Sequence, residues 1–133
     1  MIDVENQIFT TIYNAVITEY PNAKIESALN LSPSKFPCVS IEEVDNQNLL
    51  STIDSGSNEN HVTVTYEVTV WSNLTSGRKA EAKAILAIAD DILINLNFSR
   101  ITRTPIQLDD GTKYRLLARY TAIIDKNETV YRR

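Results

Sequence analysis

The stretch from Ser72 to Ala80, SNLTSGRKA, contains residue types that can bind a phosphate. It joins a strand-like segment to a helix-like run and holds one of the three glycines of the chain, Gly77, just before an arginine and a lysine. A Walker-type loop needs two glycines that bend the backbone around the phosphate, and a serine or threonine after the lysine that holds magnesium. This stretch has one glycine and has alanine after the lysine. We therefore interpret it as a turn into a helix, with Thr75 or Ser76 as the N-cap.

The only cysteine, Cys38, and the only histidine, His61, are a second candidate for chemistry. They would form a nucleophile and a general base if the strands around them paired in space. Neither residue has a neighbour in sequence that would activate it, and buried cysteines are common in protein cores. A single cysteine also excludes an internal disulfide and is typical of a reducing compartment. A small cytoplasmic enzyme that uses this pair is kept as an alternative function.

Adjacent carboxylates occur at Glu42-Glu43, Asp90-Asp91 and Asp109-Asp110. Neighbouring side chains point to opposite faces of a strand and diverge by about 100° on a helix, so none of these pairs forms a metal clamp or an acid-base pair. The His and Cys spacings of a metal cluster are also absent from the sequence. We therefore expect no catalytic residue, no bound metal and no cofactor.

A basic row, Lys113, Arg115 and Arg119, has the alternation of one face of a strand. If that strand lies beside the segment 62–70, the basic row lies next to threonines and Glu67 on the same face of the sheet. Such a row is either a solvated face, in which Glu67 pairs with an arginine, or a contact surface for a subunit or for passing DNA. The net charge of −4 argues against a dedicated, sequence-reading nucleic-acid binder.

The elements that position these residues follow from the apolar periodicity and the turn signals. The chain has 133 residues, of which 43% are hydrophobic, and this suits one domain with one core. The expected elements are a helix from Asp3 to Tyr20, extended segments at 23–29, 36–44 and 62–70, a helix at 77–95, and a hairpin of 98–108 and 112–125. The order α-β-β-β-α-β-β predicts an α+β fold, in which two helices cover one face of a mainly antiparallel sheet of four to five strands.

Three further segments are candidates for protein contacts. The polar stretch 45–60 reads as a long exposed loop, and the C-terminal arm 126–133 ends in residue types enriched in interfaces, although a frayed terminus fits the arm equally well. The back of the second helix has few long side chains, so another backbone could approach it closely. The candidate contact residues are Leu49, Leu50 and Ile53 in the loop, Ala80, Ala84, Ala87 and Asp91 on the helix, and Tyr131, Arg132 and Arg133 in the arm.

Several segments, in their joint order, resemble a family of virion proteins. They are FPCVSIEEVDN (36–46), YEVTVWSN (66–73), GRKAEAKAI (77–85) with the following Asp90-Asp91, the strand start FSRI (98–101), and YRLLARYTAIID (114–125) with the final YRR. The chain from Phe36 to its end resembles small tail-completion proteins of long-tailed bacteriophages and prophages. The resemblance is closest to the tail-terminator, or tail-to-head joining, type.

The resemblance implies a structural role without catalysis. Proteins of this type cap a growing tail tube, often as a six-membered ring, stop its polymerisation and present a surface to the head connector. The implied partners are further copies of the chain, the tail-tube protein and the head-connector protein, with DNA only as passing cargo. The implied location is the tail-head junction of the virion, after synthesis in the bacterial cytoplasm.

Other functions remain open at this point. A different neck protein, of the head-completion or connector type, is the nearest alternative, followed by the enzyme with Cys38 and His61 and by a cytoplasmic adaptor unrelated to virions. No membrane partner is expected, because no apolar run approaches the roughly 20 residues that span a bilayer and the N-terminus is unlike a signal peptide.

Overall fold

Residues 1–48 and 61–132 are described by a computed structural model, and they form two helices and six strands. In chain order the elements are α1 (Glu5–Glu19), β1 (Lys24–Glu26), β2 (Cys38–Asn48), β3 (His61–Ser72), α2 (Arg78–Asn95), β4 (Ser99–Ile106), β5 (Tyr114–Asp125) and β6 (Val130–Arg132). The predicted α+β class and the order α-β-β-β-α-β-β are confirmed, and β6 is an addition to them. No helix in these residues is long and apolar enough to cross a membrane.

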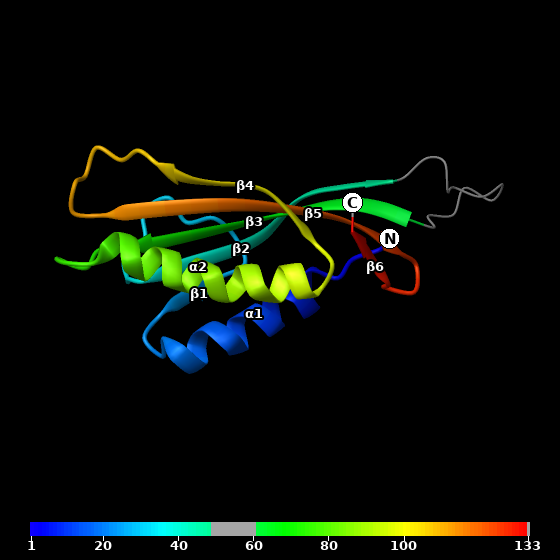
Figure 1. The fold of residues 1–133 in the computed structure, drawn as a ribbon, viewed down its shortest axis with the longest axis horizontal. Coiled ribbons are helices and arrows are strands. Elements are labelled where there is room, and N and C mark those ends of the chain that lie inside the picture. Colours follow the sequence, from blue (N-terminus) through cyan, green and yellow to red (C-terminus); the bar gives the residue numbers. More distant parts are fainter. Residues whose placement is uncertain (49–60, 133) are drawn as a thin grey trace.

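The strands form one sheet in the order β1-β2-β3-β5-β4, with β6 beside β5 (Figure 1). Neighbouring strands run antiparallel, except for β1 and β2, which are parallel. The parallel pair needs a crossover connection, which residues 27–37 supply. The sheet is therefore mainly antiparallel, as expected, with a strand more than the four to five predicted.

The second strand is longer than the sequence indicates. The predicted strand ends at Val44, whereas β2 continues to Asn48 after a bulge around Val44. This extension pairs with the start of β3 at one end of the sheet. Polar residues are tolerated there because Asp45, Gln47 and Asn48 are exposed. The rest of the predicted loop, including Leu49, Leu50 and Ile53, lies outside the described residues, as does Arg133.

The C-terminal arm contains a strand that its sequence does not predict. A turn after β5 brings the arm back to that strand. In the turn, the Asp125 carboxylate accepts hydrogen bonds from the backbone N–H groups of Asn127 and Thr129, both at 2.9 Å. Glu128 in this turn has φ 64. The turn sets Val130–Arg132 antiparallel to Ala122–Ile124. Three residues are too few to show a periodicity, so only this pairing makes them a strand.

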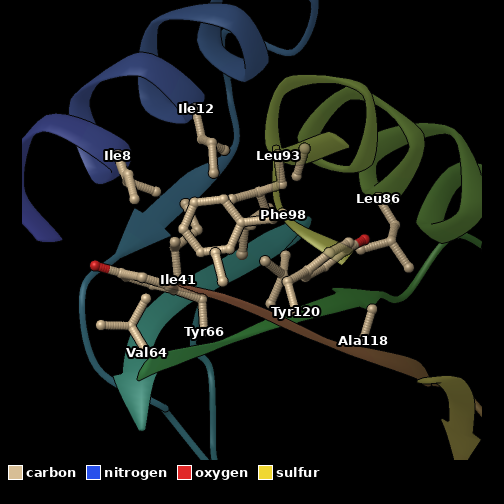
Figure 2. Packing of buried hydrophobic residues seen from close by; sticks show 14 of the residues in the cluster. Ile8, Ile12, Ile41, Val64, Tyr66, Leu86, Leu93, Phe98, Ala118 and Tyr120 are labelled. Carbon is tan, nitrogen blue, oxygen red and sulfur yellow. The ribbon is translucent and has the colours of Figure 1, made fainter. Parts of the chain in front are cut away.

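Both helices lie on one face of the sheet, and the core lies between the two layers (Figure 1). Alternate residues of β3 and β5 are buried against the helices, as the sequence alternation predicts. The side chain of Phe98 lies at the centre, and its ring meets that of Tyr66 edge-on at 5.5 Å. Figure 2 shows the residues that surround it: Ile8 and Ile12 of α1, Leu86 and Leu93 of α2, and Ile41 and Tyr120 of the sheet.

Helix α2 covers the predicted range, but its N-cap differs from the predicted one. The N-cap is Gly77, with φ 86, and no side chain caps the helix, so Thr75 and Ser76 do not have the predicted role. Glycine is suited to this position because a left-handed backbone strains other residues. The predicted apolar face is otherwise present, since Ala82, Ile85, Leu86, Ala89 and Leu93 are buried. At α1, Asp3 accepts a hydrogen bond from the backbone N–H of Glu5 at 3.0 Å, although the formal N-cap is Val4.

Candidate interaction surfaces

The face of the sheet opposite the helices carries both rows that the sequence places together. The register pairs Thr65 with Thr121, Glu67 with Arg119 and Trp71 with Arg115. Because residues in register share a face, the threonine row of β3 lies beside the basic row of β5. We call this surface the open face; its β3 and β5 residues are Thr63, Thr65, Glu67, Thr69, Trp71, Arg115, Leu117, Arg119, Thr121 and Ile123.

The cations of the open face have partners within the chain. The Arg119 Nε lies 2.9 Å from the Glu67 Oε2, with Glu67 only 9% exposed. The Arg115 guanidinium lies over the Trp71 ring at 5.1 Å, and Lys113 forms an ion pair with Asp110 at 3.4 Å. The basic row therefore does not form a free cationic stripe along which a phosphate backbone could track.

One end of the open face is buried although no helix covers it. Cys38, Thr69 and Trp71 are 0%, 0% and 5% exposed. The crossover 27–37 reaches this face, since the backbone N–H of Leu29 donates to the Glu42 Oε2 at 3.2 Å. The Phe36 ring also lies 5.5 Å from the Lys113 ammonium. The crossover therefore covers the end of the sheet where β2 begins.

Cys38 and His61 lie at opposite ends of β3. Cys38 pairs with Trp71, whereas His61 is the first residue of the same strand and pairs with Asp125. Trp71 lies ten residues after His61, which corresponds to about 33 Å along the strand. Burial, followed by the nearby charge of Glu26, raises the pKa of the Cys38 thiol to about 11. The structure therefore does not assemble the nucleophile and base that the enzyme hypothesis requires.

The phosphate-like loop uses its polar groups to hold itself together. The Arg78 guanidinium donates to the carbonyl oxygens of Leu74, Thr75 and Gly111, at 3.0, 3.3 and 2.9 Å. The Ser72 hydroxyl donates to the Glu81 carboxylate at 2.8 Å. These bonds join the loop to α2 and to the β4–β5 turn, which agrees with its interpretation as a turn.

The small-residue back of α2 is exposed, and a groove runs beside it. A hollow of about 70 Å³ separates the helix from β4. Inside it, Asp90 accepts hydrogen bonds from the Tyr120 hydroxyl at 2.6 Å and from Arg100 at 3.0 Å. Burial raises the Tyr120 pKa, and the Asp90 carboxylate adds to that increase. The exposed residues of the back include Ala80, Lys83, Ala84, Ala87 and Asp91, and the groove is lined by Lys83, Leu86, Ala87, Asp90, Arg100 and Arg103.

Asp3, Glu5 and Glu43 form an acidic cluster that the sequence does not predict. One carboxylate oxygen from each lies within 4.8 Å of the others. Burial raises the Glu43 pKa, and the charges of Asp3 and Glu5 raise it further, whereas hydrogen bonds from Asn46 and Tyr66 lower it. The members come from α1 and β2, so no sequence spacing indicates the cluster. A cluster of carboxylates does not by itself identify a metal site, and hydrogen bonds from the Glu43 backbone N–H and the Tyr66 hydroxyl occupy part of this set.

The C-terminal residues are held to the sheet. The Tyr131 hydroxyl donates to Asp125 at 3.1 Å, and its ring lies 6.1 Å from that of His61. Tyr131 remains 46% exposed, and the backbone of Arg132 pairs with Ala122. The arm is therefore part of the sheet edge through residue 132.

The chain was compared with protein families and with curated proteins: no family model matches it, and no curated protein does.

Proposed function

We propose that this chain is a structural protein that completes the tail of a long-tailed bacteriophage or prophage. In this role it caps the tail tube, ends tube polymerisation and provides the surface on which the head docks. The observation that carries the proposal is the joint order of segments from Phe36 to the end, which resembles tail terminators. The α+β layout places those segments in one sheet with one helical layer, which is consistent with that order.

The open face supports this role because DNA must pass such a cap without being held. Threonines and an internal ion pair between Glu67 and Arg119 make up much of the face. Each unbalanced cation that contacts a phosphate adds affinity, so a lining with paired cations retains DNA weakly. We assign the open face to the channel side of the assembled cap.

Another neck protein, of the head-completion or connector type, is the second candidate. The segment order that carries the proposal is also its support, because such proteins are small and occupy neighbouring positions. An enzyme based on Cys38 and His61 has no support from the geometry, since the two side chains lie at opposite ends of β3.

The test is deletion of the gene from the phage or prophage that encodes it. Electron microscopy of the resulting lysate should show tails of uncontrolled length that lack heads, and added wild-type protein should form caps at the head-proximal end of isolated tubes. Normal-length tails in the deletion strain would exclude tube capping. Normal-length tails that still lack heads would favour the connector type. A double variant, Cys38→Ala with His61→Ala, should support normal phage production and serves as the control for the enzyme alternative.

A further inference from the structure

The groove between α2 and β4 carries more positive charge than the chain itself balances. Three cations, Lys83, Arg100 and Arg103, line it, and one carboxylate, Asp90, lines it with them. Asp90 forms an ion pair with Arg100 at 3.0 Å. In the described part of the chain, neither Lys83 nor Arg103 forms an ion pair. We call this surface, made of Lys83, Ala87, Asp90, Arg100 and Arg103, the basic groove.

The volume and the lining of the basic groove suit a side chain that ends in a carboxylate. Its volume of about 70 Å³ equals roughly two water molecules at their share of liquid volume. Ala87 forms part of the lining and Ala84 is exposed one turn earlier, so on this side of the helix a partner meets small side chains next to the three cations. Two unbalanced cations are few for a duplex backbone, which is better bound by an extended basic surface.

An acidic patch of matching character lies on the other flank of the same chain. Asp3, Glu5 and Glu43 bring their carboxylates within 4.8 Å of one another. No basic side chain in the described residues forms an ion pair with them. We call these three residues the acidic corner. Burial raises the pKa of Glu43 in this corner, and the charges of Asp3 and Glu5 raise it further.

The two patches cannot meet within one copy. The acidic corner lies at β2 and the start of α1, and the basic groove at α2 and β4. Strands β3 and β5 separate β2 from β4, so the patches lie about 14 Å or more apart across the sheet. Figure 1 shows α1 and α2 side by side on the same face, so both patches border one helical layer.

We infer that a second copy of this chain places its acidic corner against the basic groove of the first. Each copy has one patch of each kind, so the contact is head-to-tail, and repeating it produces a ring when the rotation closes. The inference deepens the self-assembly part of the proposed function and names the surfaces that meet. It places Ala84 and Ala87 in the contact and leaves the open face free.

The test is charge reversal followed by mixing, with sedimentation velocity on the full chain as the measurement. Lys83→Glu with Arg103→Glu makes both patches acidic, and Asp3→Lys with Glu5→Lys makes both basic. Each variant alone should associate about 100-fold more weakly than wild type, because like charges then face each other. An equimolar mixture should recover association, since the acidic patches of one variant match the basic patches of the other.

Controls separate the interface from folding and from total charge. Lys35→Glu with Lys126→Glu makes the same change in net charge as Lys83→Glu with Arg103→Glu, but at exposed sites outside both patches. This control variant should associate like wild type. Asp3→Asn with Glu5→Gln keeps the hydrogen-bond acceptors of the α1 start and should weaken association without loss of helical circular dichroism. Wild-type association should also weaken as salt rises.

Several results would overturn the inference. They are a wild-type chain that stays monomeric at every concentration, reversal variants that associate like wild type, and a mixture that fails to recover. Groove variants that lose binding of a short DNA duplex while still self-associating would assign the groove to nucleic acid instead. The tail role is tested separately by the deletion strain. If its tails are normal while the mixture of reversal variants recovers association, the proposed function is refuted and the interface is supported. If the deletion strain has overgrown tails while the reversal variants associate like wild type, the interface is refuted and the proposed function is supported.

Discussion

The two faces of the central sheet are built from the same strands but differ in how they are closed. On the helix-covered face, alternate residues of β3 and β5 are buried in an apolar core with α1 and α2. The residues of β3 and β5 between them point to the open face, and they include threonines, Glu67, Arg119 and the half-buried Leu117. The helix-covered face therefore holds the apolar core of the fold, and the uncovered part of the open face stays available for contacts.

The open face is itself divided. Near the start of β2 the crossover covers it, and buried polar atoms of Thr69, Trp71 and Arg115 lack hydrogen-bond partners among the described protein atoms. Farther along, Thr63 and Thr65 are only half-buried. Buried groups of this kind are normally satisfied by water or by a partner. The covered end is therefore the part of the open face where ordered water is expected.

The largest predicted effect contrasts neighbouring leucines on opposite faces. Leu116 is 3% exposed on the helix-covered face, and Leu117 is half-buried on the open face. Leu116→Ala should lower the free energy of unfolding by about 2–5 kcal/mol, because it leaves a cavity in the core. Leu117→Ala should cost less than about half as much in the monomer, measured by urea denaturation. Equal losses would show that the open face is as tightly packed as the core.

The next effect concerns the turn that sets α2 on the covered face. Gly77→Ala forces a residue with a Cβ into φ 86 and should cost about 1–2 kcal/mol of stability. A Cβ there meets nothing within 4 Å, so the cost comes from the backbone alone. Gly111→Ala is the matched control, since its Cβ is equally unobstructed and its φ lies outside the left-handed region. Equal thermal stability of both variants would contradict the assigned role of Gly77.

A smaller effect is expected at the ion pair of the open face. Arg119→Ala leaves Glu67 without its ion-pair partner at 9% exposure. The Arg119 side chain is 52% exposed, so solvent screening limits the loss to about 1 kcal/mol or less. Arg119→Ala combined with Glu67→Gln should recover part of the stability, as a double-mutant cycle would show. A double variant no more stable than Arg119→Ala would mean that the pair does not compensate Glu67.

Cys38 reports on the covered end of the open face. Its side chain is buried and its pKa is raised to about 11, so the reactive thiolate is scarce near pH 8. A thiol reagent should label the native protein far more slowly than the urea-unfolded protein, as followed by mass spectrometry. Labelling at the same rate in both states would show that the crossover does not shield this end.

The smallest effect is the pH dependence from Glu43. Burial, followed by the charges of Asp3 and Glu5, raises its pKa in the folded protein above its unfolded value. The folded state therefore holds this proton more tightly, so stability falls as pH rises through the window between the two values. Subtracting the pH profile of Glu43→Gln from that of wild type should isolate this negative slope. A difference that rises with pH would reverse the assigned direction.

The elements of the fold were largely predictable because each has a long periodic signal. The alternation from Val62 to Val70 and the helical stripe of α2 each exceed two repeats, so local residue patterns identify both the element and its buried face. The N-cap of α2, Gly77, and the strand β6 were missed. Both depend on backbone geometry and pairing over a few residues, for which periodicity contains little information.

The candidate surfaces were only partly predictable. The neighbouring threonine and basic rows follow from strand parity, and the exposed back of α2 follows from helical spacing. The aromatic rings that contact Arg115 and Lys113 belong to a tryptophan and a phenylalanine from other elements. The acidic corner and the basic groove also combine residues from different elements, so no local pattern shows them.

The sequence by itself determined the α+β class, the order of the elements and the separation of an apolar from a polar sheet face. Those properties follow from side-chain alternation along one strand or helix, which needs no knowledge of what lies beside it. Only the tertiary structure decided that Cys38 and His61 lie at opposite ends of β3, and that Lys83 with Arg103 and Asp3 with Glu43 form separate charged patches. These properties depend on strand order and register, which are set by contacts between residues far apart in the chain.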